Sequence, residues 1–225
     1  MAFWMTHLRV AEALLPYLPA VSLPHYYVGA LGPDCGRTEQ NPDGSPLYLP
    51  GRKASHWIVP DEERNCSSIG FEAFYEALMP CAKTPEQIAF YWGYYIHLIT
   101  DAMWGEQVIR PRKKSLAECT PANVKAMKDD IYRADLAFFR QHPDYAPLAV
   151  IRGIGSFPND YLDYYNETDL EEQMHRIPEK LRQDAADDPA ESLWLCEDEL
   201  DEFVLFATAK CIQLVRQHRA ETEKQ

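Results

Sequence analysis

The chain contains no apolar run long enough to cross a bilayer. Its most apolar stretch, residues 88–99, has 12 residues, whereas a membrane-spanning helix needs about 20. The first ten residues also lack the cationic and uninterrupted apolar segments of a secretion signal. The sequence therefore predicts a cytoplasmic protein with neither a membrane span nor a signal peptide.

Basic charge is scarce. Only 22 Lys and Arg residues stand against 35 Asp and Glu, which gives a net charge of −13. Such a field repels phosphate backbones and anionic lipid headgroups, so it excludes avid, non-specific nucleic-acid binding. A small phosphorylated substrate is still compatible, because a bound cation can invert the potential inside one pocket.

Cys-x-x-Cys pairs are absent, and the cysteines are widely scattered: Cys35, Cys66, Cys81, Cys119, Cys196 and Cys211. With 46% hydrophobic residues, the chain can build a core without disulfides. We expect reduced, mostly buried thiols within a single domain that covers residues 1–225.

Helix-start signals are frequent instead. Thr84-Pro85 and Thr120-Pro121 place proline at a first helical position, and a capping box begins at Thr168. Pro111 is expected to end one helix, and Pro178 to kink or split another. Because strand-like alternation is almost absent, the predicted fold class is all-α, one compact multi-helix domain. The expected helices cover residues 6–18, 71–78, 84–109, 120–141 and 189–219, with a further one from 168.

Residues 32–68 form the longest stretch without helical periodicity. They are rich in Gly, Pro, Asn, Asp and Ser, and residues 41–46 carry a plain turn signal. Loops of this length in compact domains are often functional. We therefore expect this segment to contribute to a site.

His97 and Asp101 form the sharpest local feature. Four residues on a helix bring two side chains onto one face, about 6 Å apart along the axis. Apolar and aromatic neighbours surround both residues in the sequence, so the pair should be partly buried. A buried carboxylate needs a cation or a hydrogen-bonding partner. The pair is therefore either a metal site or an aspartate that orients a neutral histidine.

Three other residues gain meaning from their order. His7 follows Thr6 near the start of a helix, Asp34 lies in a Gly-rich turn, and His56 lies in the long loop. Taken singly, these residues suit a core histidine, a turn cap and a surface histidine. In chain order the pattern is Thr6-His7, Gly29-x-x-Gly-Pro-Asp34, Lys53-x-x-His56 and Gly93-Tyr-Tyr-Ile-His97-x-x-x-Asp101.

At these residues the first half of the chain resembles the zinc-dependent phospholipase C family, whose relatives include single-strand-specific zinc nucleases. The resemblance implies an all-helical fold in which two or three zinc ions serve the hydrolysis of phosphate esters. It also implies that His7 binds a neighbouring zinc and that Asp101 bridges the two ions. The implied ligands of the first zinc are Asp34, His56, His97 and Asp101.

The family's remaining ligands have no clear counterpart. Its members use a downstream histidine and a His-x-x-x-Glu pair, a spacing that occurs here only at His175 and Glu179. The sequence leaves open which residue, if any, completes a second or third site. The candidates are Glu106, Asp130, Asp135 and His175.

The predicted function is a metal-dependent hydrolase, a phosphoesterase that acts on a small phosphoester substrate. Zinc or another first-row ion would activate water, and Asp34 or Asp101 would accept its proton. The alternative is a non-catalytic helical binding protein that keeps a structural metal in the same cleft. The Tyr-rich stripes at residues 91–95 and 161–165 favour core packing over the stacking of bases or headgroups.

Overall fold

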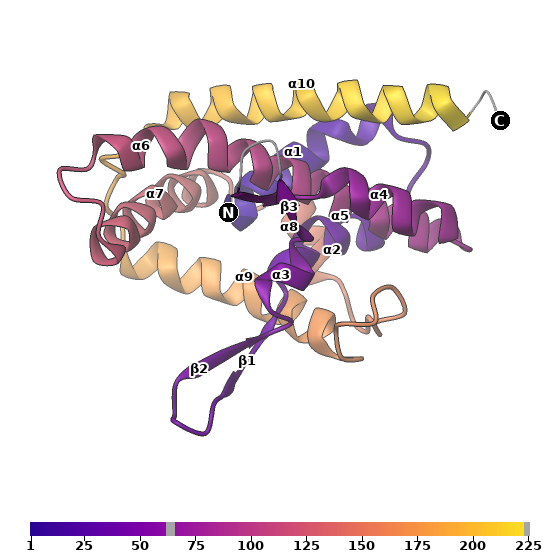
Figure 1. The fold of residues 1–225 in the computed structure, drawn as a ribbon, viewed down its shortest axis with the longest axis horizontal. Coiled ribbons are helices and arrows are strands. Elements are labelled where there is room, and N and C mark those ends of the chain that lie inside the picture. The colour runs from indigo at the N-terminus through magenta and orange to yellow at the C-terminus, as the bar shows by residue number, and fades with distance from the viewer. Residues whose placement is uncertain (62–65, 223–225) are drawn as a thin grey trace. The chain divides into compact units, whose positions relative to one another are not determined.

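The computed structural model describes residues 1–61 and 66–222, and helices dominate them (Figure 1). The strands form two separate antiparallel pairs, β1–β2 and β3–β4. The all-α prediction is thereby confirmed. No helix within these ranges combines the length and the apolar character that crossing a membrane requires. The elements are α1 Trp4–Leu14, α2 Leu23–Leu31, β1 Arg37–Gln40, β2 Pro46–Leu49, α3 Arg52–Ser55, β3 Ile58–Asp61, β4 Cys66–Ile69, α4 Phe71–Leu78, α5 Pro85–Trp104, α6 Arg110–Ser115, α7 Pro121–Gln141, α8 Ala146–Arg152, α9 Asp169–Asp187 and α10 Glu197–Thr222.

The chain divides into two compact units. Unit 1 comprises Met1–Pro19, Thr100–Ala146 and Glu179–Gln225, and unit 2 comprises Ala20–Ile99 and Pro147–Pro178. Helices α5 and α9 each run from one unit into the other. The expectation of a single domain stays a prediction.

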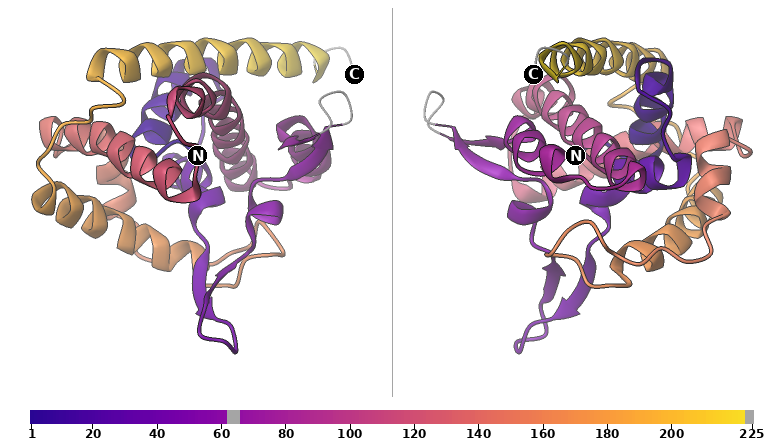
Figure 2. Two further views of the ribbon diagram at one scale, coloured as in Figure 1. Left: turned by 60° about the vertical axis from the view of Figure 1, so that its left-hand side comes forward. Right: turned by 90° about the vertical axis from the view of Figure 1, so that its right-hand side faces the viewer.

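In unit 1, helix α1 packs against α10 and α7 (Figure 2). Its buried face presents Met5, Leu8 and Ala11 to that core. In this core the Trp104 ring packs edge to face on the Phe203 ring, with the ring centroids 4.8 Å apart. Burial of these apolar faces, at about 25 cal/mol per Å², is the main stabilising term of the unit.

Pro111 does not end the helix, contrary to the sequence prediction. Helix α5 passes through a π-helical turn, Gly105–Ile109, directly into α6, and Pro111 lies in the first turn of α6. A proline in a regular helix clashes with the carbonyl four residues earlier, here that of Gln107. Gln107 belongs to the wider π turn, which moves that carbonyl away and lets the helix continue.

Asp130 on α7 holds the segment that leads into α10. Its Oδ2 accepts hydrogen bonds from Ser192 Oγ at 2.7 Å and from the main-chain N–H groups of Leu193 and Trp194, each at 2.9 Å. Its Oδ1 accepts a bond from Arg133 at 2.9 Å. Burial alone would raise the pKa of Asp130, but these hydrogen bonds outweigh it and the net pKa is lowered. Asp130 is therefore an anchor within unit 1.

Asp130→Asn is expected to lower the free energy of unfolding by about 2–3 kcal/mol, because the amide offers one acceptor where the carboxylate offered two. Since folding lowers the pKa of Asp130, its contribution is present above the unfolded pKa of about 3.9 and is lost as the pH falls through the lower folded value. The gap between parent and variant should therefore shrink below about pH 4. Denaturant unfolding of parent and variant at several pH values measures this difference in stability.

The matched control is Asp129→Asn, one residue earlier. Asp129 is exposed and pairs with Lys125 one turn away, so its loss should change stability by less than about 0.5 kcal/mol. Equal effects of the two variants would show that the Asp130 anchor is energetically unimportant.

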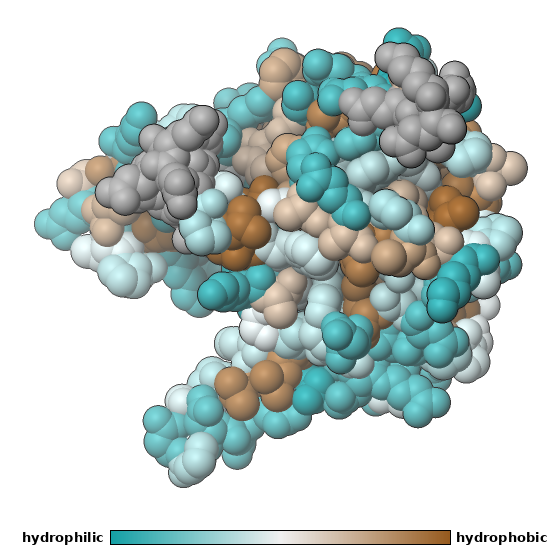
Figure 3. Space-filling model, turned by 45° about the vertical axis from the view of Figure 1, so that its right-hand side comes forward, coloured by the Kyte–Doolittle hydropathy of each residue, from teal (hydrophilic) through white to brown (hydrophobic). Residues whose placement is uncertain are grey.

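In unit 2, residues 37–69 contain two β-hairpins, although the sequence showed no strand pattern there. Strand β1 pairs with β2 from Arg37 opposite Leu49 to Gln40 opposite Pro46. The expected turn at the tip is confirmed, with Gly44 at a φ of 81°. This hairpin projects from the helices of its unit and is largely hydrophilic at its tip (Figure 3). Residues 62–65 of the predicted loop lie outside the described residues.

The β1–β2 hairpin also brings the segment before β1 close to the segment after β2. Asp34 precedes β1 and His56 follows β2 and the short helix α3. Because antiparallel pairing brings Arg37 opposite Leu49, the two flanking segments emerge at the same end of the hairpin. The long segment thus joins two candidate site residues.

Other helix boundaries also correct the sequence prediction. Helices α2 and α8 were not expected, Pro178 does not split α9, and α10 begins at Glu197 rather than at residue 189.

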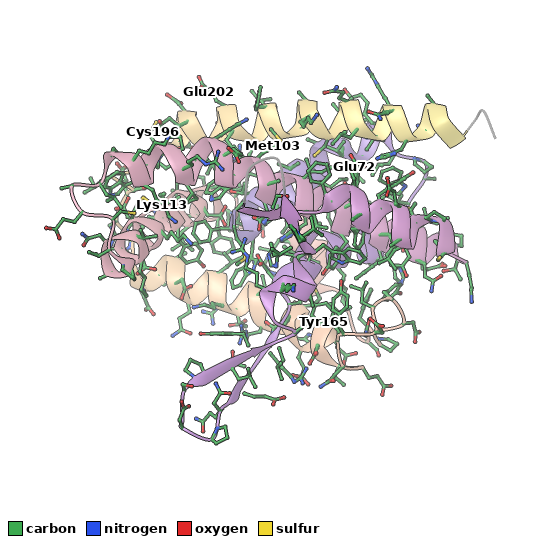
Figure 4. The ribbon with its side chains drawn as sticks, viewed as in Figure 1. Glu72, Met103, Lys113, Tyr165, Cys196 and Glu202 are labelled. Atoms are coloured by element: carbon green, nitrogen blue, oxygen red, sulfur yellow. The ribbon has the colours of Figure 1, made fainter. Side chains whose placement is uncertain are left out.

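The expectation of mostly buried thiols is wrong. Cys35 and Cys211 are buried, whereas Cys81, Cys119 and Cys196 are exposed free thiols. The three exposed cysteines lie at helix junctions or in a connection, as Cys196 does at the start of α10 (Figure 4). The side chain of Cys66 lies outside the described residues.

Candidate metal centre

The close crossing of α2 and α5 in unit 2 depends on two glycines. A Cβ placed on Gly93 would lie 2.0 Å from the Tyr26 carbonyl oxygen, and one on Gly29 would lie 2.0 Å from the Phe90 carbonyl oxygen. Real Cβ contacts are never this short, so only glycine allows the two backbones to touch. The crossing brings the last turn of α2 against the turn of α5 that carries His97.

His97 is fully buried and its orientation is fixed. Its Nδ1 lies 2.8 Å from the carbonyl oxygen of Ala30 on α2. A carbonyl can only accept a hydrogen bond, so Nδ1 carries a proton, and in the neutral ring Nε2 then carries the lone pair. Histidines that bind metals usually make this kind of bond with the nitrogen that does not face the ion.

Asp34 closes the 3-10 turn Gly32–Asp34 that follows α2. The turn is held by the Cys35 N–H, which donates to the Gly32 carbonyl at 2.9 Å. The Asp34 carboxylate is nearly buried, and its Oδ1 lies 3.4 Å from Nε2 of His56. The sequence interpretation of Asp34 as part of a Gly-rich turn is confirmed.

His56 follows α3, where the chain reverses sharply. Trp57, the next residue, has a φ of 48°, a left-handed conformation that costs energy for a bulky residue. The other ring nitrogen of His56, Nδ1, lies 2.9 Å from Ser55 Oγ. The rings of His56 and His97 meet edge to face, with centroids 5.6 Å apart. Taken singly, His56 suited a surface loop histidine, whereas the structure buries it.

These three residues form the first group, which lies within unit 2. Asp34 and His56 each offer a ligand atom within 4.8 Å of one on His97. Two imidazoles and one carboxylate are a donor set that suits zinc and other first-row ions. The residues present therefore fit a divalent metal.

A second group lies within unit 1. Nε2 of His7 on α1 lies 3.5 Å from Oδ1 of Asp101 on α5, and both side chains are buried. The same oxygen accepts a hydrogen bond from the Ala2 N–H at 2.6 Å and lies 3.9 Å from the Met1 amino group. Asp101 follows His97 by four residues on α5, so one helix supplies a member of each group.

Asp135 fixes the start of α1 beside His7. Its two oxygens accept bonds from Met5 N at 2.9 Å, Thr6 N at 2.8 Å and Thr6 Oγ1 at 2.7 Å. Complete burial raises the pKa of Asp135, and the three hydrogen bonds and the nearby His7 act against that rise. Asp135 therefore stabilises the first turn of the helix that carries His7.

The other candidates for a further metal site differ in their surroundings. Glu106 forms an ion pair with Arg110 at the surface, and His175 is exposed on α9. Asp130 is engaged as the anchor of residues 192–194. Only Asp135 among the four directly contacts a residue next to His7.

A shallow apolar groove of about 530 Å³ lies in unit 2 beside the His56 turn. It is lined by Gly51, Lys53, Ala54, Trp57, Ile58, Val59 and Tyr164. Because Lys53 and Trp57 flank His56 in sequence, the groove adjoins the first group.

Sequence reasoning missed what holds these residues. The Ala30 carbonyl and the hydroxyls of Tyr94 and Tyr165 contact the site residues or their backbone. The spacing of Gly29 and Gly93, each shortly before a candidate ligand, was the one signal that could have indicated the helix crossing.

Comparison with known proteins adds no relative. No family model matches the chain, and neither a curated protein nor a solved structure matches it.

Proposed function

We propose that this chain is a metal-dependent hydrolase of phosphate esters that binds one or two zinc ions or other divalent first-row ions. One ion would bind the first group, and the second group would bind another. Asp101 extends the ligand set, because its helix places it one turn beyond His97. The order of these residues resembles the zinc-dependent phospholipase C family, and that family's fold is part of the proposal. The proposed ligands are His7, Asp34, His56, His97 and Asp101.

The observation that carries the proposal is the fixed tautomer of His97. Its Nδ1–H is engaged by Ala30, so Nε2 is the ring nitrogen that would bind an ion. His56 and Asp34 each offer a ligand atom within 4.8 Å of one on His97. Burying two imidazoles and a carboxylate together is costly unless a cation or hydrogen bonds compensate. A divalent ion satisfies all three at once.

The chain's own residues would bind the ion and accept a proton. When bound, such an ion supplies Lewis acidity and lets water ionise near neutral pH. Asp34 or Asp101 would accept the proton. Oδ1 of Asp101 lies near Ala2, Met1 and His7, and Oδ1 of Asp34 lies 3.4 Å from Nε2 of His56.

Turnover of bis(4-nitrophenyl) phosphate tests the proposal. The zinc-loaded parent should hydrolyse it, a chelator should abolish turnover, and added zinc should restore it. Asp101→Asn keeps the shape of the side chain but removes its negative charge. It should therefore lower turnover by about 10- to 100-fold, with helix content nearly unchanged.

Asp129→Asn, on the surface of α7, is the control and should retain the parent's turnover. A parent that shows no turnover on a broad panel of phosphoesters, yet melts at a much lower temperature without metal, contradicts the hydrolase.

That outcome supports the second candidate, a non-catalytic binding protein with a structural metal. The apolar groove beside His56 is the observation that favours it, because apolar concave surfaces bind ligands without chemistry.

A further inference from the structure

A chain of hydroxyl groups ends on the backbone beside His56. The Tyr94 hydroxyl donates to the carbonyl oxygen of Ser55 at 2.5 Å, the last carbonyl before His56. The Tyr164 hydroxyl donates to the Tyr94 oxygen at 3.0 Å, and the Trp57 indole donates to the Tyr164 oxygen at 3.1 Å. Tyr94 lies on α5, three residues before His97. One helix thus carries a proposed ligand and the group that holds the backbone of another.

A second tyrosine holds the Asp34 turn. The hydroxyl of Tyr165, on the segment that leads into α9 (Figure 4), donates to the Gly32 carbonyl oxygen at 2.7 Å. On the other side of Asp34, Nε2 of Gln173 donates to the Gly36 carbonyl oxygen at 3.1 Å. The turn is therefore fixed at both ends by side chains more than 130 residues away in sequence.

Both tyrosine side chains are buried donors. Tyr94 has 0% and Tyr165 has 5% of its surface exposed. Burial raises the pKa of both hydroxyls well above the usual value, so they stay protonated and keep donating at physiological pH. The Tyr94 ring also stacks on Phe74 with centroids 4.7 Å apart. A phenylalanine in its place keeps this packing and removes only the hydroxyl.

We propose that Tyr94 and Tyr165 are positioning residues of the metal centre, which set the placement of His56 and Asp34 relative to His97. This inference rests on the proposed function. Neither hydroxyl would bind the ion. Each would fix the main chain beside a ligand, so that its loss loosens the ligand geometry and not the core. Residues that orient ligands in this way commonly change metal affinity by about 10- to 100-fold.

Cobalt binding to the full-length, metal-free protein tests the inference, because the visible absorption of Co²⁺ reports ligand geometry as well as affinity. Tyr94→Phe and Tyr165→Phe should each weaken Co²⁺ binding by about tenfold or more and change the intensity of the visible bands. Helix content should stay at the parent's level.

The matched control is Tyr91→Phe. Tyr91 lies one turn earlier on α5, is buried, and donates to the Tyr161 carbonyl oxygen at 2.9 Å, a bond of the same kind that is not adjacent to a ligand. It should lower the melting temperature about as much as Tyr94→Phe, while leaving Co²⁺ affinity and spectrum unchanged.

Three results would overturn the inference. If all three variants bind Co²⁺ like the parent, the tyrosines only pack the core and the proposed function stands. If Tyr91→Phe weakens Co²⁺ binding as much as the other two variants, a general loss of core packing, not ligand positioning, explains the weaker binding. A parent that binds no Co²⁺ removes both the proposed function and the inference.

Discussion

Gly93→Ala should lower the free energy of unfolding by about 3 kcal/mol or more. The added Cβ would lie 2.0 Å from the Tyr26 carbonyl oxygen and 2.7 Å from the Ala30 main-chain nitrogen. Both are backbone atoms of α2, so no flexible side chain can move to make room. Overpacked sites commonly cost 1–3 kcal/mol, and rigid ones cost more. Urea unfolding followed by circular dichroism measures the change.

The same substitution should also disturb the site. Separating α2 from α5 lengthens the bond between Ala30 and His97, which fixes the tautomer of the histidine. In Gly29→Ala the added Cβ would lie 2.0 Å from the carbonyl oxygen of Phe90 on α5. This variant should lose a similar amount of unfolding free energy.

Gly105→Ala is the control for this prediction. A Cβ at Gly105 meets no atom within 4 Å, and alanine in a helix is favoured over glycine by about 0.5–1 kcal/mol. This variant should be as stable as the parent or slightly more so. Equal stability of Gly93→Ala and Gly105→Ala would contradict the contact between α2 and α5.

The helices with local start signals could be predicted from the sequence. Thr84 and Thr120 accept hydrogen bonds from Gln87 N and Asn123 N, each at 3.2 Å, as their capping motifs predict. Helices α5 and α7 accordingly begin at Pro85 and Pro121. These signals succeed because cap and partner lie three residues apart, so the tertiary structure has little influence on them.

Helices without such a pattern were missed for physical reasons. Helix α2 has nine residues, and Tyr26–Leu31 are buried without interruption, so no polar face reveals a helical period. Helix α8 has only seven residues. The hairpins of residues 37–69 have four-residue strands, which is too short for alternation to stand out.

The site residues could be suggested from their order, but not the contacts that hold them. Met5 and Thr6 meet Asp135 about 130 positions away, and Gly32 meets Tyr165 at a separation of 133. No local pattern encodes such pairs. The Tyr-rich stripes were expected to pack the core. The tyrosines of residues 91–95 do so, as does Tyr165, whereas Tyr161 and Tyr164 are half-buried. The hydroxyls of Tyr94 and Tyr165 also bond to the backbone beside His56 and Asp34.

The second large effect concerns the metal content of the chain. His97→Ala removes the histidine whose Nδ1 is held by Ala30 and whose ring meets both Asp34 and His56. It should lose at least one zinc ion per chain, since it removes one of the two imidazoles of the first group. His175→Ala, on the exposed face of α9, is the matched control and should keep the parent's metal content.

Elemental analysis of the parent, purified without chelator, incubated with zinc and freed of unbound metal, tests this claim most directly. We expect roughly one to two zinc ions per chain, with at least one lost in His97→Ala and none in His175→Ala. A parent that holds no stoichiometric transition metal after this treatment would contradict this claim.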